Sequence, residues 1–113
     1  IVVGPTVREP DGLAMSSRNV YLSDEERTAA LSLYRCLQRA RSLIHSGQRD
    51  LCAVRAAMLE ELAAPALVRP DYATICDADD LEELTAPRPQ MVALVAARVG
   101  ATRLIDNLLI PSP

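Results

Sequence analysis

The chain has 113 residues, a length that fits a single domain with a modest core and no need for cross-links. Half of its residues are apolar, yet it has neither Phe nor Trp, so the core must be built mainly from aliphatic side chains. A net charge of −3 and a pI of about 5.1 disfavour nucleic acid as a partner, because binding a polyanion requires a basic face.

Residues 1–3 form a short apolar run that Gly4 and Pro5 terminate. We interpret this run as the end of a buried strand or as a connector between two domains. Because the sequence does not begin with Met, we expect it to belong to a longer protein. We see no secretory leader and no membrane-spanning stretch, and we therefore expect a cytoplasmic location.

Residues 5–22, with the sequence PTVREPDGLAMSSRNVYL, hold more polar chemistry than folding requires. Asp11 and Gly12 predict a tight turn, since Gly accepts the positive φ of such turns. Ser16 and Ser17 offer hydroxyl donors, and Arg18 adds a planar fork that suits phosphate oxygens. The segment therefore favours a phosphate-binding loop, although an ordinary surface turn with a helix cap would have the same spacing.

A long amphipathic helix is predicted for residues 24–46. Ser23 and Glu26 have the spacing of a capping box, which marks its start, and Gly47 marks its end. The apolar positions recur with helical spacing and form one face: Ala30, Leu33, Tyr34, Leu37, Ala40 and Ile44.

Asp50 predicts the cap of a second helix, which Pro65 ends. Its apolar face consists of Leu51, Val54, Met58 and Leu62. Residues 72–76 then read as a strand, and residues 81–84 as one short helical turn.

Residues 91–99 form a continuous apolar run that is typical of a central buried strand and too short to cross a membrane. Gly100 begins a loop of about three residues, and residues 103–110 return as a second strand. These elements predict an α+β fold, in which two antiparallel helices pack on one face of a small three-stranded antiparallel sheet.

Several other polar residues have plain structural interpretations. Cys36, Cys52 and Cys76 are odd in number and widely spaced, which favours reduced core or half-buried thiols over a disulfide framework or a zinc site. His45 is expected to be exposed at the end of the first helix. The acidic residues that follow the first strand fit no calcium-loop spacing and read as a solvated strand exit: Asp77, Asp79 and Asp80.

Asp106 and Asn107 interrupt an apolar strand. We expect local hydrogen bonds at a strand end to satisfy them, with a role at a domain interface as the alternative. The pattern assigns no role to Arg8 or to Asn19.

The string PTVREPDGLAMSSRNVYL closely resembles the segment that opens the C-terminal domain of the pantoate–β-alanine ligases. In that family the MSSRN stretch is the counterpart of the KMSKS loop of class I aminoacyl-tRNA synthetases. The later strings DYATICDADDLEEL and LVAARVGATRLIDNLLI are also similar to the family, so the resemblance covers nearly the whole chain.

The resemblance implies that the ATP-binding residues of this chain are Val7, Met15, Ser16, Ser17 and Arg18. Val7 would contact the nucleotide through its backbone, and the serines and Arg18 would hold phosphates. We expect no catalytic residue and no metal site in this chain. In the family, Mg²⁺ and both organic substrates, pantoate and β-alanine, are held mainly by an N-terminal Rossmann-like domain, which nothing in this sequence matches.

On this reading residues 1–113 form a C-terminal domain that acts as a lid over ATP, is inactive alone and has its own N-terminal domain as partner. The resemblance also implies a homodimer at full length. The rival hypothesis is a non-enzymatic interaction module whose Ser-Ser-Arg loop is only a structural turn. A helix-turn-helix nucleic-acid reader is a more distant alternative, which the acidic balance disfavours.

Overall fold

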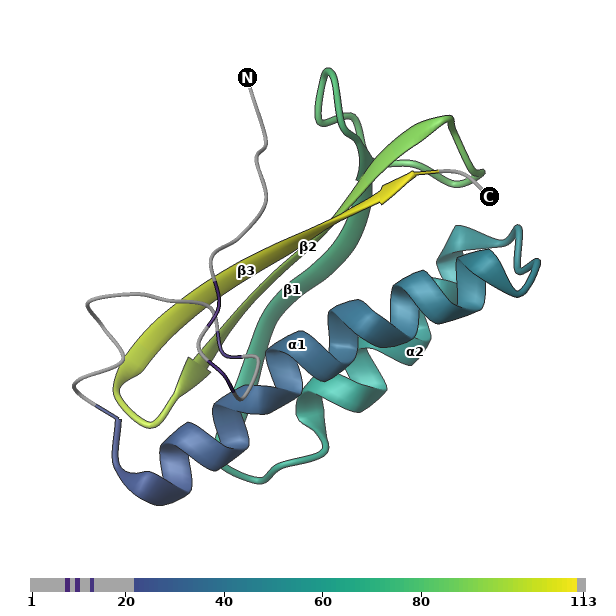
Figure 1. The fold of residues 1–113 in the computed structure, drawn as a ribbon. Coiled ribbons are helices and arrows are strands. Elements are labelled where there is room, and N and C mark those ends of the chain that lie inside the picture. The colour runs from purple at the N-terminus through teal and green to yellow at the C-terminus, as the bar shows by residue number, and fades with distance from the viewer. Residues whose placement is uncertain (1–7, 9, 11–12, 14–21, 112–113) are drawn as a thin grey trace.

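The computed structural model describes Arg8, Pro10, Leu13 and residues 22–111. Two helices come first and three strands follow: α1 (Asp24–His45), α2 (Leu51–Ala63), β1 (Val68–Asp77), β2 (Gln90–Val99) and β3 (Thr102–Pro111). The helices lie side by side on one face of the sheet, with α2 packed on β1 and α1 on β2 and β3 (Figure 1). The α+β architecture predicted from the sequence is therefore confirmed.

Helix α1 begins at the predicted capping box. The Ser23 hydroxyl oxygen accepts a hydrogen bond from the Glu26 amide at 3.2 Å, and the Glu26 carboxylate accepts one from the Ser23 amide at 2.9 Å. The helix ends with Ser46 as its C-cap, directly before Gly47, whose φ of 107° lies in the region that favours glycine. Both helix boundaries thus follow from the local sequence.

Helix α2 is capped by Asp50, whose carboxylate accepts a hydrogen bond from the Cys52 amide at 3.0 Å. Its four predicted core residues are all buried: Leu51, Val54, Met58 and Leu62. The buried Ser32 hydroxyl of α1 donates to the Leu62 carbonyl oxygen at 3.2 Å. This bond links the two helices at a position that the apolar periodicity does not mark.

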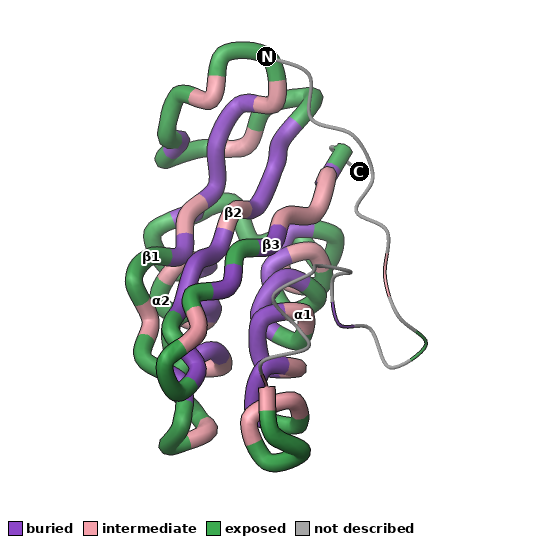
Figure 2. Tube along the Cα trace, turned by 90° about the vertical axis from the view of Figure 1, so that its left-hand side faces the viewer, coloured by how far each residue is buried: buried purple, intermediate pink, exposed green. Residues whose placement is uncertain are grey.

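The strands are ordered β1-β2-β3, and both pairings are antiparallel. Strand β2 is central, and alternate residues along it enter the core beneath the helices: Met91, Ala93, Val95, Ala97 and Val99. Figure 2 shows the resulting buried layer along β2 and along α1. Strand β1 is longer than the predicted strand, and a bulge between Pro70 and Tyr72 accommodates a proline at this edge of the sheet.

Two local predictions are wrong. Val99 pairs with Thr102, so the hairpin loop contains two residues rather than about three, and Gly100 supplies the positive φ of 61° that such a tight turn needs. Residues 81–84 form no helical turn. Instead Glu83 bridges to Cys76, and the Leu84 amide donates to the Ile75 carbonyl oxygen at 2.9 Å, because this arrangement buries the Leu84 side chain in the core.

The three cysteines are free thiols. Cys36 and Cys76 are buried as expected, whereas Cys52 is exposed near the start of α2. His45 is exposed at the end of α1, with Nε2 at 3.3 Å from the Pro111 carbonyl oxygen. Among the described residues, no helix has the length and apolar character needed to cross a bilayer.

Candidate functional site

The five residues predicted to contact ATP lie outside the part of the chain that the structure describes: Val7, Met15, Ser16, Ser17 and Arg18. Asn19 lies outside it as well. The structure does describe three residues of the same polar segment, Arg8, Pro10 and Leu13. Pro10 is exposed, whereas Arg8 and Leu13 both contact the body of the domain.

Arg8 makes a two-pronged ion pair with Asp106 of β3. Its Nη1 donates to Asp106 Oδ2 at 2.6 Å, and its Nη2 donates to Oδ1 at 3.1 Å. Nη2 also donates to the carbonyl oxygen of Asn107 at 3.0 Å. A guanidinium that meets a carboxylate with both prongs has a fixed orientation as well as a strong hydrogen bond. Arg8 is therefore held in one defined orientation on β3.

Helix α1 also contacts Arg8, through the ring of Tyr34. The guanidinium carbon of Arg8 lies 3.9 Å from the centre of the Tyr34 ring, which is a cation–π distance. The Arg8 side chain is only 15% exposed and that of Asp106 only 2%. We call Arg8, Tyr34 and Asp106 the Arg8 cluster; it joins the polar N-terminal segment to α1 and β3.

Asp106 occupies a position where the strand pattern calls for an apolar side chain. It pairs with Val95 of β2, which belongs to the buried core, so both side chains are on the helix-covered face of the sheet. The Asn107 amide donates to Asp106 Oδ1 at 2.7 Å. Because Oδ2 is taken by Arg8, both carboxylate oxygens of this buried group have partners.

These contacts correct the prediction that local hydrogen bonds at a strand end satisfy Asp106, because its main partner is the distant Arg8. Both residues lie within β3, and the partner of Asp106 is 98 positions away in the sequence. One sequence signal could have indicated the site. Asp106 falls in the inward-facing set of β3 with Leu104 and Ile110, where an acid needs a buried cationic partner. The identity of that partner, Arg8, was not readable from any local pattern.

Leu13 is a second point of attachment. Its side chain is 4% exposed and belongs to the same hydrophobic core as the inward-facing residues of α1 and β2. Burial of a leucine side chain stabilises a structure by about 2 kcal/mol. The polar segment is thus attached to the domain body by an ion pair at Arg8 and by apolar burial at Leu13.

The acidic residues at the end of β1 serve the local structure. Asp77, the last residue of that strand, is buried rather than solvated as predicted, whereas Asp79 and Asp80 are exposed. Asp77 Oδ1 accepts a hydrogen bond from the Asp79 amide at 2.8 Å, and Oδ2 lies 3.5 Å from Arg88. Asp80 accepts one from the Glu82 amide at 2.9 Å. Within residues 22–111 and the three described residues before them, no group of three His, Cys, Asp or Glu side chains is arranged to hold a metal ion.

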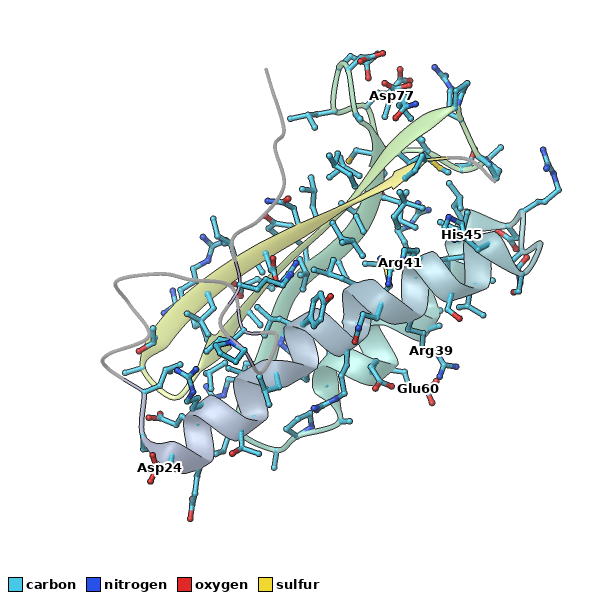
Figure 3. All side chains as sticks on the ribbon, viewed as in Figure 1. Asp24, Arg39, Arg41, His45, Glu60 and Asp77 are labelled. Atoms are coloured by element: carbon cyan, nitrogen blue, oxygen red, sulfur yellow. The ribbon has the colours of Figure 1, made fainter. Side chains whose placement is uncertain are left out.

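An open groove of about 520 Å³ lies along the two helices. Its lining residues are Arg35, Gln38, Arg39, Ser42, Leu43 and Glu61. Arg35 and Glu61 approach to 3.7 Å, but both are partly solvated, so their pairing is weak. Figure 3 shows Arg39 and Glu60 on the outer side of the helices, away from the sheet.

Beneath this surface, Cys36 is fully buried. Burial, assisted by the carboxylates of Glu61 and Asp106, raises the pKa of its thiol from 9.0 to about 12. A thiol with this pKa is protonated at neutral pH and cannot act as a nucleophile. Cys36 is therefore a core residue.

Comparison with known proteins matches residues 1–109 to the family model described as pantoate-beta-alanine ligase. The pantothenate synthetase of Roseiflexus castenholzii is 51% identical over 110 residues, which cover 97% of this chain and 40% of that protein. A crystal structure of pantothenate synthetase from Thermus thermophilus is 43% identical with a TM-score of 0.86, over 93% of this chain and 38% of that one.

A pantoate-beta-alanine ligase from Francisella tularensis, described as complexed with beta-gamma ATP and beta-alanine, has a similar fold. It is 23% identical with a TM-score of 0.53, over 96% of this chain and 32% of that one. The chain thus spans about 40% of the length of the curated relatives that it matches.

Proposed function

The chain belongs to the pantoate-beta-alanine ligase family, and from this premise we propose that it is the C-terminal domain of a cytoplasmic ligase that joins pantoate to β-alanine with the use of ATP. The observation that carries the proposal is the family match over residues 1–109, nearly the whole chain. The remainder of such a ligase is proposed to include a Rossmann-like nucleotide-binding domain, and the proposal is supported by the 40% share of the curated relatives that this chain spans.

The proposed reaction has two steps. Pantoate attacks the α-phosphate of ATP, which gives pantoyl adenylate and releases pyrophosphate. The amine of β-alanine then attacks the acyl carbon of the adenylate, which gives pantothenate and releases AMP. Because the adenylate supplies a good leaving group, the contribution of the protein is mainly positioning and the stabilisation of developing charge.

In this reaction the MSSR sequence is proposed to close over ATP. Ser16, Ser17 and Arg18 would donate hydrogen bonds to phosphate oxygens as negative charge builds on the departing pyrophosphate. Met15 and the backbone of Val7 would contact the nucleotide. Closure would also exclude water, which otherwise hydrolyses an acyl adenylate.

Beta-gamma ATP and beta-alanine are the ligands named for the Francisella tularensis ligase. The proposal requires ATP and β-alanine as substrates, and at 23% identity that protein shares only the fold with this chain. Among the described residues no group of three His, Cys, Asp or Glu side chains could hold a metal ion, and no step is assigned to a metal held by this chain. We place Mg²⁺, together with pantoate and β-alanine, mainly on the remaining domain, and we expect the full-length enzyme to be a homodimer.

The test is a steady-state assay of the full-length protein that contains this chain, with ATP, pantoate and β-alanine as substrates. The proposal predicts pantothenate formation that falls by about 100-fold or more when Arg18→Met removes a donor to the developing charge. Arg49→Met is the matched control, because Arg49 lies exposed between α1 and α2, and this variant should retain wild-type rates.

The rival hypothesis, a non-enzymatic interaction module, predicts no pantothenate from the full-length protein. Equal rates for the Arg18→Met and Arg49→Met variants would retain the ligase but remove the phosphate role of Arg18. The 113-residue chain alone offers one wall of the pocket and should show no turnover. Full activity of that chain would contradict the proposed division of labour between two domains.

A further inference from the structure

The Arg8 cluster is more constrained than stability requires. Its carboxylate is buried and accepts from both Arg8 and the Asn107 amide, and its guanidinium also contacts the Tyr34 ring. A buried ion pair seldom stabilises a protein more than a well-packed apolar pair of the same volume would. What such a pair does supply is one defined geometry, since a forked guanidinium and a carboxylate meet in a single plane.

The position of the cluster in the chain indicates what this geometry controls. Val7, a proposed nucleotide contact, directly precedes Arg8 in the sequence. Leu13, the second attachment, precedes Met15 by two residues. Each part of the proposed ATP site is therefore within two residues of an attachment point in the sequence.

The attachments also differ in kind. Leu13 is held by apolar burial, which is not directional, whereas Arg8 is held by directional bonds from β3 and a ring from α1. Directional bonds define the local course of the backbone more closely than apolar contact does. A shift of about 1 Å in a group that orients substrate can lower a rate by about 100-fold.

We propose that the Arg8 cluster positions the ATP-contacting segment of the ligase, with Arg8, Tyr34 and Asp106 as positioning residues. None of the three needs to touch the substrates. The inference rests on the proposed function, because it assigns the cluster a role only in binding the nucleotide of that reaction. It predicts that perturbing the ion pair weakens the use of ATP more than the use of β-alanine.

The experiment uses the full-length protein and measures kcat and KM separately for ATP and for β-alanine. Arg8→Met should raise KM for ATP by about 10-fold, as expected when one positioning contact is lost, and leave KM for β-alanine within about 2-fold. Arg8→Lys retains the positive charge but loses the two-pronged guanidinium, so we expect a KM for ATP between those of the wild-type and Arg8→Met proteins. Asp106→Glu retains the pair but lengthens it by one methylene, and it too should raise KM for ATP.

The matched control is Arg35→Met. Arg35 of α1 forms an ion pair with Glu61 of α2 at 3.7 Å, and this pair is partly solvated. The substitution should leave both KM values at wild-type levels. A purely structural role for Arg8 would lower the active fraction of the enzyme without changing KM for ATP.

The outcomes separate the inference from the proposed function. If the wild-type protein forms no pantothenate, the proposed function fails. If the wild-type protein is active and the Arg8→Lys and Asp106→Glu proteins fold and show wild-type KM for ATP, the inference is overturned. These two conservative variants decide the question even if Arg8→Met does not fold, because both retain the buried opposite charges.

Discussion

Removal of Arg8 should destabilise the domain far more than removal of a surface arginine. The substitution Arg8→Met keeps most of the side-chain volume but leaves the carboxylate of Asp106, whose side chain is 2% exposed, without its cation. Removing one partner of a buried ion pair lowers the free energy of unfolding by about 3–5 kcal/mol. The lower end applies here, because the Asn107 amide still donates to Asp106 Oδ1 and Arg8 itself is 15% exposed.

The matched control is again Arg35→Met, which removes the partly solvated pair with Glu61. Exposed ion pairs contribute about 0–1 kcal/mol, so this variant should unfold close to the wild-type midpoint. The double variant Arg8→Met/Asp106→Leu removes both charges. It should regain most of the loss, because an apolar pair can replace a buried ion pair at little cost.

The assay is urea unfolding of the 113-residue chain followed by circular dichroism, with the free energy obtained by linear extrapolation. We expect Arg8→Met to lose about 3 kcal/mol and the double variant to lie within about 1 kcal/mol of wild type. An Arg8→Met midpoint equal to that of Arg35→Met would refute the reasoning. It would show that the ion pair does not form in solution or that solvent screens it.

Further variants and reagents test the local geometry. An alanine Cβ at Gly100 would collide with Glu26 Oε2, so Gly100→Ala must displace the capping-box carboxylate as well as strain a φ of 61°. An alanine Cβ at Gly47 meets no atom within 4 Å. Urea unfolding should therefore show the Gly100→Ala chain to be about 1 kcal/mol less stable than the Gly47→Ala chain. A thiol reagent should modify the exposed Cys52 in the native chain and all three cysteines in denaturant; rapid native labelling of more than one thiol would contradict the described burial. Burial raises the pKa of the Cys36 thiol from 9.0 to about 12, so its contribution to stability is complete below pH 9 and is lost as the pH rises towards 12. Cys36→Ala should reduce the loss of stability over that window, and unchanged pH profiles would contradict the raised pKa.

The sequence was most informative where local chemistry decides the structure. The Ser23–Glu26 capping box, the glycine after α1 and the long apolar run of β2 predicted their elements correctly, because each depends on residues within a few positions of one another. Residues 81–84 were predicted wrongly as a helical turn. Their conformation is set by pairing of Glu83 with Cys76 and by burial of Leu84, which are tertiary contacts.

The candidate site was predicted only in part. Resemblance to the ligase family identified Val7 and the MSSR residues, and these remain predictions because they lie outside the described residues. No local pattern could have connected Arg8 with Asp106, since the two are 98 positions apart. The alternation of β3 marks Asp106 as inward-facing, but only the folded chain shows which cation meets it.

The proposed ligase activity is best tested by the product stoichiometry of the full-length protein, with ATP, pantoate and β-alanine supplied together. We predict that pantothenate and AMP form in equal amounts, since each acyl adenylate that β-alanine consumes releases one AMP. Failure to form pantothenate, or the release of ADP in place of AMP, would contradict assignment of this domain to an adenylate-forming ligase.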